Sequence, residues 1–390
     1  MTCADYAPRE RIFRTEKQGG KMTEDLVTLV VDNGSYSCKS GFANENSPRA
    51  FTPPIVGRPH DELKGDLKKE YIIGDEVRKT KELLSVRYPI EFGVISNWDE
   101  MEKLWRYIFY DQLQTSPEDH PVLLTRPPHN PRGVTEKMAE MMFEKFETPA
   151  LYIAITGALS LLSSGKGATT GLVLDSGETT THAMRIHEGY CISARCDRVD
   201  FAGRNLTSYL SRELHEKGCS FQHGTEYDVI HDIKKTLCCV SENYESSASD
   251  QEMSYELPDG TQITFGKERF ICPEILFTPK IAGIEFPGIH ELILMTIQKA
   301  DPSLHKDMYN NIVLAGGTTL FPGIADRLTK ELKTGLSMSE DVNVIADKNR
   351  EYSAWLGGSI VGNLSTFDKF CVKKEHYDEM GPALCSQKYF

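Results

Sequence analysis

Two aspartates with matching surroundings are the strongest candidates for chemistry. Asp32 and Asp175 each end a short apolar run, and a glycine, Gly34 or Gly177, follows two residues later. A carboxylate at a strand end can hold a hydrated Mg²⁺ or Ca²⁺, and a glycine lets backbone N–H groups turn toward an anion. Together the two segments predict a site that grips one polyphosphate and its metal from opposite sides.

A second pair of residues lies at the same offset from these aspartates. Lys39 follows Asp32 by seven residues, and His182 follows Asp175 by seven. If each aspartate ends the first strand of a hairpin, Lys39 and His182 return on the second strand, where Lys39 could neutralise phosphate charge. The residues alone also fit ordinary strand-ending turns, with His182 a satisfied strand residue.

The elements that position these residues can be read from the pattern of apolar side chains. Three buried strands are predicted, each running into a turn that contains glycine: Val27–Asp32, Gly171–Asp175 and Asn311–Leu314. The third turn, Gly316-Gly317, would let a ligand approach the backbone closely. Because the unit of strand, Asp, small polar residue and glycine occurs twice, the sequence predicts two related α/β halves that face each other.

Helical periodicity is found between and after these strands. Four helices are expected from it: Asp99–Leu113, Thr135–Phe146, Gly203–Lys217 and Asp228–Tyr244. A further helix follows the third turn and runs through Leu332. Loops are expected at Pro59–Lys69 and Ser246–Glu252, and a turn between two short strands at Tyr255–Gly260.

Composition excludes several classes of function. The 390 residues carry a net charge of −13, which disfavours direct nucleic-acid binding. No apolar run approaches the roughly 20 residues of a membrane helix. Ten cysteines without C-x-x-C spacing favour reduced thiols in the cytosol or nucleus. Residues 1–21 lack the apolar segment of a secretory signal and are interpreted as a flexible extension.

The chain resembles the actin family in many segments that follow the family's order. The resemblance extends from about Val27 to Phe390, and its segments are VVDNGSYSCKSGFA, GRPH, YPIEFGVISNW, HPVLLT, LVLDSGETTTH, DIKKTLC, SYELPDG, LAGGTTLFPGIADRL and GNLSTF. It implies an α/β fold of two ribonuclease-H-like domains, as in actin, heat-shock ATPases and sugar kinases. ATP or ADP with Mg²⁺ or Ca²⁺ would lie in the cleft between them.

The resemblance also divides the chain into four subdomains. The first large subdomain and the small one inserted in it would be made of residues 22–53, 89–163 and 353–390, and of 54–88. The second large subdomain and its small one would be made of residues 164–201 and 285–352, and of 202–284.

Site residues follow from the resemblance position by position. Asp32 and Asp175 would organise the water shell of the metal, while His182 and Thr156 would lie near the attacking water. The residues that would contact phosphate, ribose or adenine are Gly34, Ser35, Lys39, Gly177, Glu178, Gly203, Lys234, Lys235, Gly316, Gly317, Thr318, Phe321 and Glu351. A cleft for protein partners would be bordered by Leu162, Val361, Leu364 and Phe370.

Departures from the family pattern change the expected activity. Tyr36 stands where actin has a glycine in the first phosphate loop, and Glu178-Thr179 replace Asp-Gly in the second. Both changes put bulk where the backbone should approach phosphate. Thr156 replaces the glutamine that positions the attacking water and is too short for the same reach. Hydrolysis is therefore expected to be weak or absent.

The adenosine pocket and the filament contacts depart from the family as well. The family's Arg, Glu, Tyr and Lys positions hold His231, Lys235, Phe321 and Glu351. Because two charges are thereby exchanged, Lys235 and Glu351 are expected to approach each other across the cleft. The loop that inserts into the next filament subunit aligns with Asp61–Glu70, which is highly charged. Seating it in an apolar groove would cost desolvation, so self-assembly is expected to be weak.

The sequence therefore favours an ATP-binding, actin-related protein that serves the cytoskeleton or another assembly. Protein partners are expected at the cleft, with actin or a second copy bound only weakly, and without nucleic-acid binding or membrane insertion. The cytoplasm is the expected location, with the nucleus as the second. Three alternatives stay open: a filament-forming ATPase, a nuclear chromatin-complex subunit, and a phosphotransferase related to sugar kinases.

Overall fold

The computed structural model describes residues 27–60, 70–192, 196–219, 221, 226–244, 252–257, 260–336 and 341–389. The extension 1–21 lies outside these residues. Of the charged loop Asp61–Glu70 only Glu70 is described, and of the expected loop Ser246–Glu252 only Glu252.

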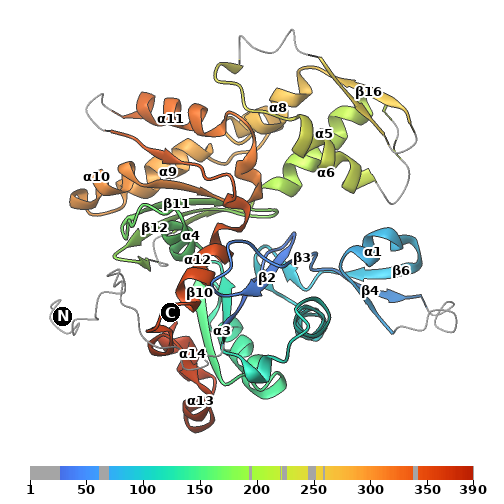
Figure 1. The fold of residues 1–390 in the computed structure, drawn as a ribbon. Helices are drawn as coiled ribbons and strands as arrows, with labels where there is room; N and C mark the ends of the chain where they lie inside the picture. The colour runs from blue at the N-terminus through green and yellow to red at the C-terminus, as the bar shows by residue number, and fades with distance from the viewer. Residues whose placement is uncertain are drawn as a thin grey trace.

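The first half of the molecule is built on a six-stranded sheet (Figure 1). In the order β19-β10-β9-β1-β2-β3, its strands are Val372–Lys373, Ala150–Ile155, Val122–Arg126, Leu29–Asp32, Cys38–Phe42 and Ala50–Thr52. β1 runs antiparallel to β2 and parallel to β9. All four residues of β1 are buried, as its unbroken apolar run predicts.

The second half repeats this plan. β11 (Gly171–Ser176) runs antiparallel to β12 (Thr181–His187) and parallel to β17 (Ile312–Ala315). The sheet is completed by β13 (Tyr190–Cys191), β14 (Asp197–Val199) and β18 (Val344–Ile345). The duplication predicted from the sequence is confirmed, because β1, β2 and β9 have the same directions as β11, β12 and β17.

Two helices lie between the sheets and join the halves (Figure 1). α4 (Thr156–Ser163) packs on β11 and β12, while α12 (Ser353–Gly362) packs on β1 and β9. The helices also pack tightly on each other: a Cβ at Gly357 would lie 2.0 Å from the carbonyl oxygen of Leu159. Gly357 therefore sets how closely the two halves meet.

The other helices of the two large halves lie around the outside of the sheets. They are α2 (Trp98–Arg106), α3 (Arg132–Glu140), α9 (Ile289–Gln298), α10 (Pro302–Asn310), α11 (Ile324–Gly335), α13 (Lys374–Met380) and α14 (Ala383–Lys388). The predicted helices Asp99–Leu113 and Thr135–Phe146 correspond to α2 and α3, each continued by a π-helical turn. Within the described part of the chain, no helix combines the length and the apolar character needed to cross a membrane.

Two smaller groups of elements extend from the same side of the molecule, at the right of Figure 1. The first contains β4 (Val56–Pro59), β5 (Ile72–Ile73), β6 (Leu84–Arg87) and α1 (Asp75–Lys79). The second contains α5 (Gly203–Glu216), α6 (Glu226–Leu237), α8 (Glu268–Glu274) and the hairpin of β15 (Met253–Glu256) with β16 (Gln262–Phe265). The hairpin confirms the two expected short strands, but Tyr255 and Glu256, expected in the turn between them, belong to β15.

Two predicted boundaries are wrong. α6 ends at Leu237 and not at Tyr244, because Cys239 N–H donates to the Arg269 carbonyl at 3.1 Å and Val240 N–H to the Pro322 carbonyl at 2.8 Å. These tertiary hydrogen bonds take donors that a longer helix would use. Pro59, expected in a loop, ends β4 opposite Leu84.

Candidate functional site

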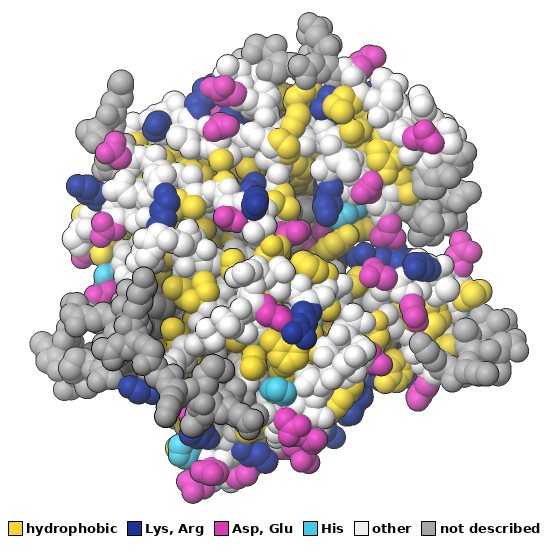
Figure 2. All heavy atoms as spheres, in the orientation of Figure 1, with side chains coloured by type: hydrophobic (Ala, Val, Ile, Leu, Met, Phe, Trp, Pro, Cys, Tyr) yellow, Lys and Arg dark blue, Asp and Glu magenta, His cyan; other side chains and the backbone are white. Residues whose placement is uncertain are grey.

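A cavity of about 610 Å³ lies between the two halves. It is walled by the turns after β1, β11 and β17, by α6, and by residues around the start of α12. Figure 2 shows charged side chains gathered at the right of the view, where the upper and lower halves meet. Of the expected nucleotide, metal and catalytic residues, only Gly203 and His182 are absent from the lining.

The two hairpins have the register that the matching offsets predict. Asp32 pairs with Lys39 across β1 and β2, and Asp175 pairs with His182 across β11 and β12. Residues that pair in this way lie on the same face of a sheet. Lys39 Nζ accordingly lies 3.4 Å from Asp32 Oδ2.

The Asp32 carboxylate is held from both sides. Thr125 Oγ1 donates to Asp32 Oδ1 at 2.7 Å and accepts the Asn33 N–H at 3.0 Å. Trp105 Nε1–H donates to Asn33 Oδ1 at 3.0 Å, which fixes the turn that follows. With Lys39 at its other oxygen, the Asp32 side chain is oriented before any ligand binds.

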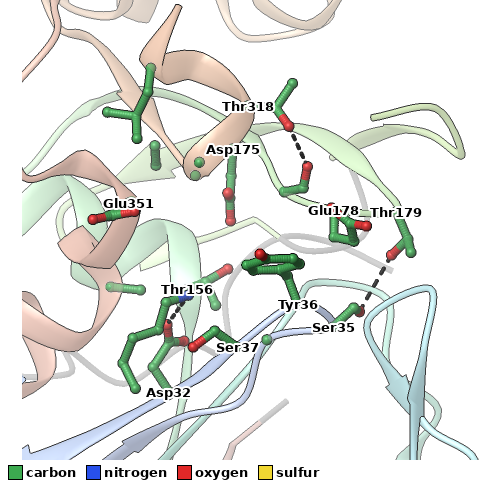
Figure 3. A pocket seen from close by; sticks show the side chains of 18 of the residues that line it. Asp32, Ser35, Tyr36, Ser37, Thr156, Asp175, Glu178, Thr179, Thr318 and Glu351 are labelled. Carbon is green, nitrogen blue, oxygen red and sulfur yellow. Dashed lines mark hydrogen bonds and ion pairs between the residues drawn. The ribbon is translucent and has the colours of Figure 1, made fainter. Parts of the chain in front are cut away.

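Asp175 faces Asp32 from the opposite half. Figure 3 shows both carboxylates directed into the cavity. Complete burial, and in second place the negative charge of Asp32, raise the pKa of Asp175 to about 6. A cation between the two carboxylates would relieve both effects, so the pair is suited to a site for a positive ion.

The turn after β17 brings backbone against Asp175. Gly316 has a φ of +84°, and a Cβ there would lie 2.3 Å from the Ser176 carbonyl oxygen and 2.6 Å from Asp175 Oδ1. Only glycine fits this position. Next to it, Thr318 Oγ1 donates to the Gly177 carbonyl at 2.6 Å, which joins the turns after β17 and β11.

The two phosphate loops contact each other across the cavity. Ser35 Oγ accepts from Thr179 Oγ1 at 3.3 Å and from Gly93 N–H at 3.2 Å, and its own hydrogen can still be donated to a ligand (Figure 3). Gly177 N–H, expected to face phosphate, donates instead to the Thr180 carbonyl at 3.1 Å within its own hairpin.

The expected catalytic side chains differ in position. Thr156 begins α4 at the cavity wall, and its buried hydroxyl interacts with Asp175, whose pKa it lowers. His182 lies behind the wall on β12, where burial and then the Arg198 charge lower its pKa to about 3. A base works best with a pKa near the working pH, so His182 is poorly tuned for proton abstraction at neutral pH.

The expected adenosine contacts form the opposite wall. Lys234 Nζ donates to the Gly203 carbonyl and to Thr207 Oγ1, both at 2.7 Å, and this holds Gly203 just behind the cavity. Lys235 and Glu351 both line the cavity. Among the described residues no ion pair joins them, so the exchanged charges do not make the contact expected across the cleft.

The expected partner-cleft residues gather on one hydrophobic cluster at α4 and α12. Val361 is part of its buried core, and Leu162 and Phe370 pack against it while partly exposed. Leu364 follows directly after α12 and is partly exposed. Phe370 also lies against Tyr152, with 5.9 Å between ring centres. Of the four residues, Leu162, Leu364 and Phe370 are thus the ones that stay partly exposed.

Several side chains that line the cavity were not assigned from the sequence. Tyr36 and His231 were identified only as departures from a family pattern, and Arg78 was not considered. Arg78 reaches the cavity from α1, and no local spacing signals this, because α1 and the phosphate loops are brought together only by the fold.

Comparison with protein-family models identifies the family. Residues 23–390 match the model described as Actin, which is nearly the whole chain.

Proposed function

The chain belongs to the actin family, and on that premise we propose that it is an ATP-binding structural subunit with weak ATP hydrolysis and weak self-assembly. It would work in a cytoskeletal or other protein assembly, with partners at the surface formed by Leu162, Leu364 and Phe370. A cytoplasmic location belongs to the same proposal.

One observation carries the nucleotide part of the proposal. Two opposed hairpins direct Asp32 and Asp175 into one cavity of about 610 Å³, and Gly316 leaves a space there that any Cβ would fill. Asp32 and Asp175 would hold the divalent cation, and Ser35 and Lys39 the phosphates. The cation would supply positive charge to the phosphate oxygens when bound.

The metal site suits a nucleotide-bound ion better than a protein-bound one. No group of three or more metal-ligating side chains occurs within the described ranges. Mg²⁺ usually keeps several waters and takes one or two carboxylates together with phosphates, which fits the two aspartates here. The adenosine would lie toward Lys234, Lys235, Phe321 and Glu351, which line the same cavity.

Weak hydrolysis is supported by the two catalytic positions. The Thr156 side chain is short, and the neutral His182 is buried behind the wall. We infer that a short hydroxyl side chain and a neutral imidazole with a lowered pKa activate water weakly, which supports slow hydrolysis.

The purified protein is expected to bind Mg-ATP, hydrolyse it slowly and remain largely unassembled. At a free ligand concentration of 100 times Kd, binding should stabilise the fold by about 2.7 kcal/mol. Thermal melting with and without Mg-ATP, ATP turnover and sedimentation should be measured on one preparation. An unchanged melting temperature at saturating Mg-ATP would contradict the proposed nucleotide binding. Long filaments in the pellet would favour the filament-forming alternative.

Thr156→Gln is expected to raise ATP turnover by about tenfold, because positioning the attacking water removes entropy from the barrier. Thr156→Val is the matched control for the hydroxyl: it has the same shape and removes the Oγ1 that interacts with Asp175. Steady-state phosphate release measures both. Equal turnover in Thr156→Gln and Thr156→Val would contradict the role given to this position.

A further inference from the structure

Three rings are stacked across the cleft between the halves. The Tyr36 ring, in the turn after β1, lies 4.5 Å from the His231 ring of α6, with 19° between their planes. Tyr36 Oη and His231 Nδ1 are 3.3 Å apart, within hydrogen-bond distance. Tyr227 continues the stack on α6 at 6.1 Å and 23°. The stack therefore connects the first phosphate loop to a helix of the other half.

Charged and polar contacts flank the stack at both ends. The Arg78 guanidinium lies 4.9 Å from the centre of the Tyr36 ring, and its Nε is 3.9 Å from Asp228 Oδ1. Lys81 Nζ is 3.0 Å from Asp228 Oδ2. These contacts link the segment around α1 directly to α6 across the mouth of the cleft.

At the other end of the stack, Tyr227 contacts the second expected phosphate loop, the turn after β11. The Tyr227 hydroxyl donates to the Glu178 carboxylate, and Thr179 donates to Ser35 Oγ in the first loop at 3.3 Å. The helix α6 and both phosphate loops are thus part of one contact network.

The two central rings are uncharged at neutral pH. Burial, and then the charge of Lys234, lower the pKa of His231 to about 3, and burial raises the pKa of Tyr36. The hydrogen bond between them therefore buries no charge. Stacked aromatic rings attract each other beyond their buried area, and a guanidinium over a tyrosine face adds to this.

The stack lies at the cavity proposed above to hold the nucleotide. Tyr36, Arg78, His231 and Glu178 all line the cavity. Figure 3 shows the Tyr36 ring lying across it, between Asp32 and Glu178. Widening the cleft requires Tyr36 to part from His231 and Arg78 to part from Asp228, because the members of each pair belong to opposite halves.

We propose that Tyr36, His231 and Arg78 form a latch that holds the nucleotide cleft closed, so that uptake and release of nucleotide both wait for the stack to open. The proposal rests on the nucleotide binding proposed above and adds the step that controls exchange. A latch changes the height of a barrier that both directions share, so its removal accelerates binding and release together.

Tyr36→Ala is expected to raise the association and dissociation rates of a fluorescent ATP analogue with Mg²⁺ by about tenfold each, a barrier change of the size that stacking supplies. Kd should then change by less than about threefold, because the two effects cancel in the ratio of the rates. Tyr36→Phe keeps the ring, so it should give rates close to the parent's. Tyr190→Ala, at an exposed tyrosine of β13, is the control away from the cleft. Stopped-flow fluorescence of the full chain measures all four proteins.

The outcomes separate the latch from the proposed function. Faster release with unchanged association would show that Tyr36 only contacts the nucleotide, and unchanged rates in a protein that binds nucleotide would overturn the latch alone. Arg78→Gln gives a second test if Tyr36→Ala does not fold, and it should accelerate both rates while leaving the rings in place.

If neither the parent nor any variant binds the analogue, the proposed nucleotide binding is wrong. Hydrogen exchange of the nucleotide-free protein then tests the latch by itself. Faster exchange of the α6 amides in Tyr36→Ala than in Tyr190→Ala would support it, and equal exchange would overturn it.

Discussion

Gly316→Val is expected to abolish detectable nucleotide binding. The φ of Gly316 is +84°, a backbone conformation that β-branched residues rarely adopt. A Cβ there would lie 2.3 Å from the Ser176 carbonyl and 2.6 Å from Asp175 Oδ1. Relief of this clash must displace either the turn after β17 or the Asp175 carboxylate, and both form the cavity. We expect at least about a hundredfold loss of Mg-ATP affinity, equivalent to about 2.7 kcal/mol.

Gly283→Val provides the control for this variant. Gly283 also has a positive φ, 72°, but it lies outside the cavity lining and its added Cβ would meet no atom within 4 Å. Its affinity should remain within a few fold of the parent's when both are titrated with a fluorescent ATP analogue. Circular dichroism of both variants shows whether the fold is kept. A Gly316→Val protein that binds Mg-ATP as tightly as Gly283→Val would contradict the placement of the nucleotide at this turn.

Arg327→Leu is expected to cause a large loss of stability. Arg327 lies in the first turn of α11, and its Nη1 and Nη2 donate to the two oxygens of Glu274 on α8 at 2.8 and 2.9 Å. Its Nη1 also donates to the Ser241 carbonyl and its Nε to Glu331. Both members of the pair with Glu274 are almost fully buried. Removing the arginine leaves a buried carboxylate without its cation, which typically costs about 3–5 kcal/mol.

Arg49→Leu is the control for charge removal. Arg49 pairs with Glu45 at the surface, with more than half of its side chain exposed, and such pairs are worth about 0–1 kcal/mol. Urea and thermal unfolding of the two variants should therefore differ clearly. The double variant Arg327→Leu with Glu274→Leu should recover much of the loss, because no buried charge is then left unpaired. Similar destabilisation by Arg327→Leu and Arg49→Leu would mean that the buried pair does not hold α11 on α8.

The sequence by itself determined the duplicated plan and the register of both hairpins. Each aspartate ends an apolar run, and a turn of fixed length returns the chain, so the partners Lys39 and His182 follow from counting along a strand. The glycine requirement after β17 was also readable, because a strand that runs into two glycines signals close backbone approach. A local sequence pattern is sufficient to predict a contact when the interacting residues are near each other in the chain.

Helix ends and the use of individual hydrogen bonds were decided by tertiary structure. The apolar periodicity after Asp228 continues past Leu237, but the N–H groups of Cys239 and Val240 bind carbonyls from distant segments and end the helix. Gly177 N–H was assigned to phosphate, and in the folded chain it closes its own hairpin. Periodicity describes which face is apolar, and it carries no information about which distant acceptor competes for a donor.

Tyr36 shows most clearly the difference between what the sequence predicts and what only the tertiary structure determines. In the sequence it is only a bulky residue in a loop where glycine is expected. In the structure its ring points away from the loop and stacks on His231 of α6, which lies 195 residues away in the chain and across the cleft. The direction in which a side chain points depends on the partners that surround it, and the partners of Tyr36 come from α1 and α6. They meet only when both halves have folded and closed on each other, which is why no local pattern could reveal the contact.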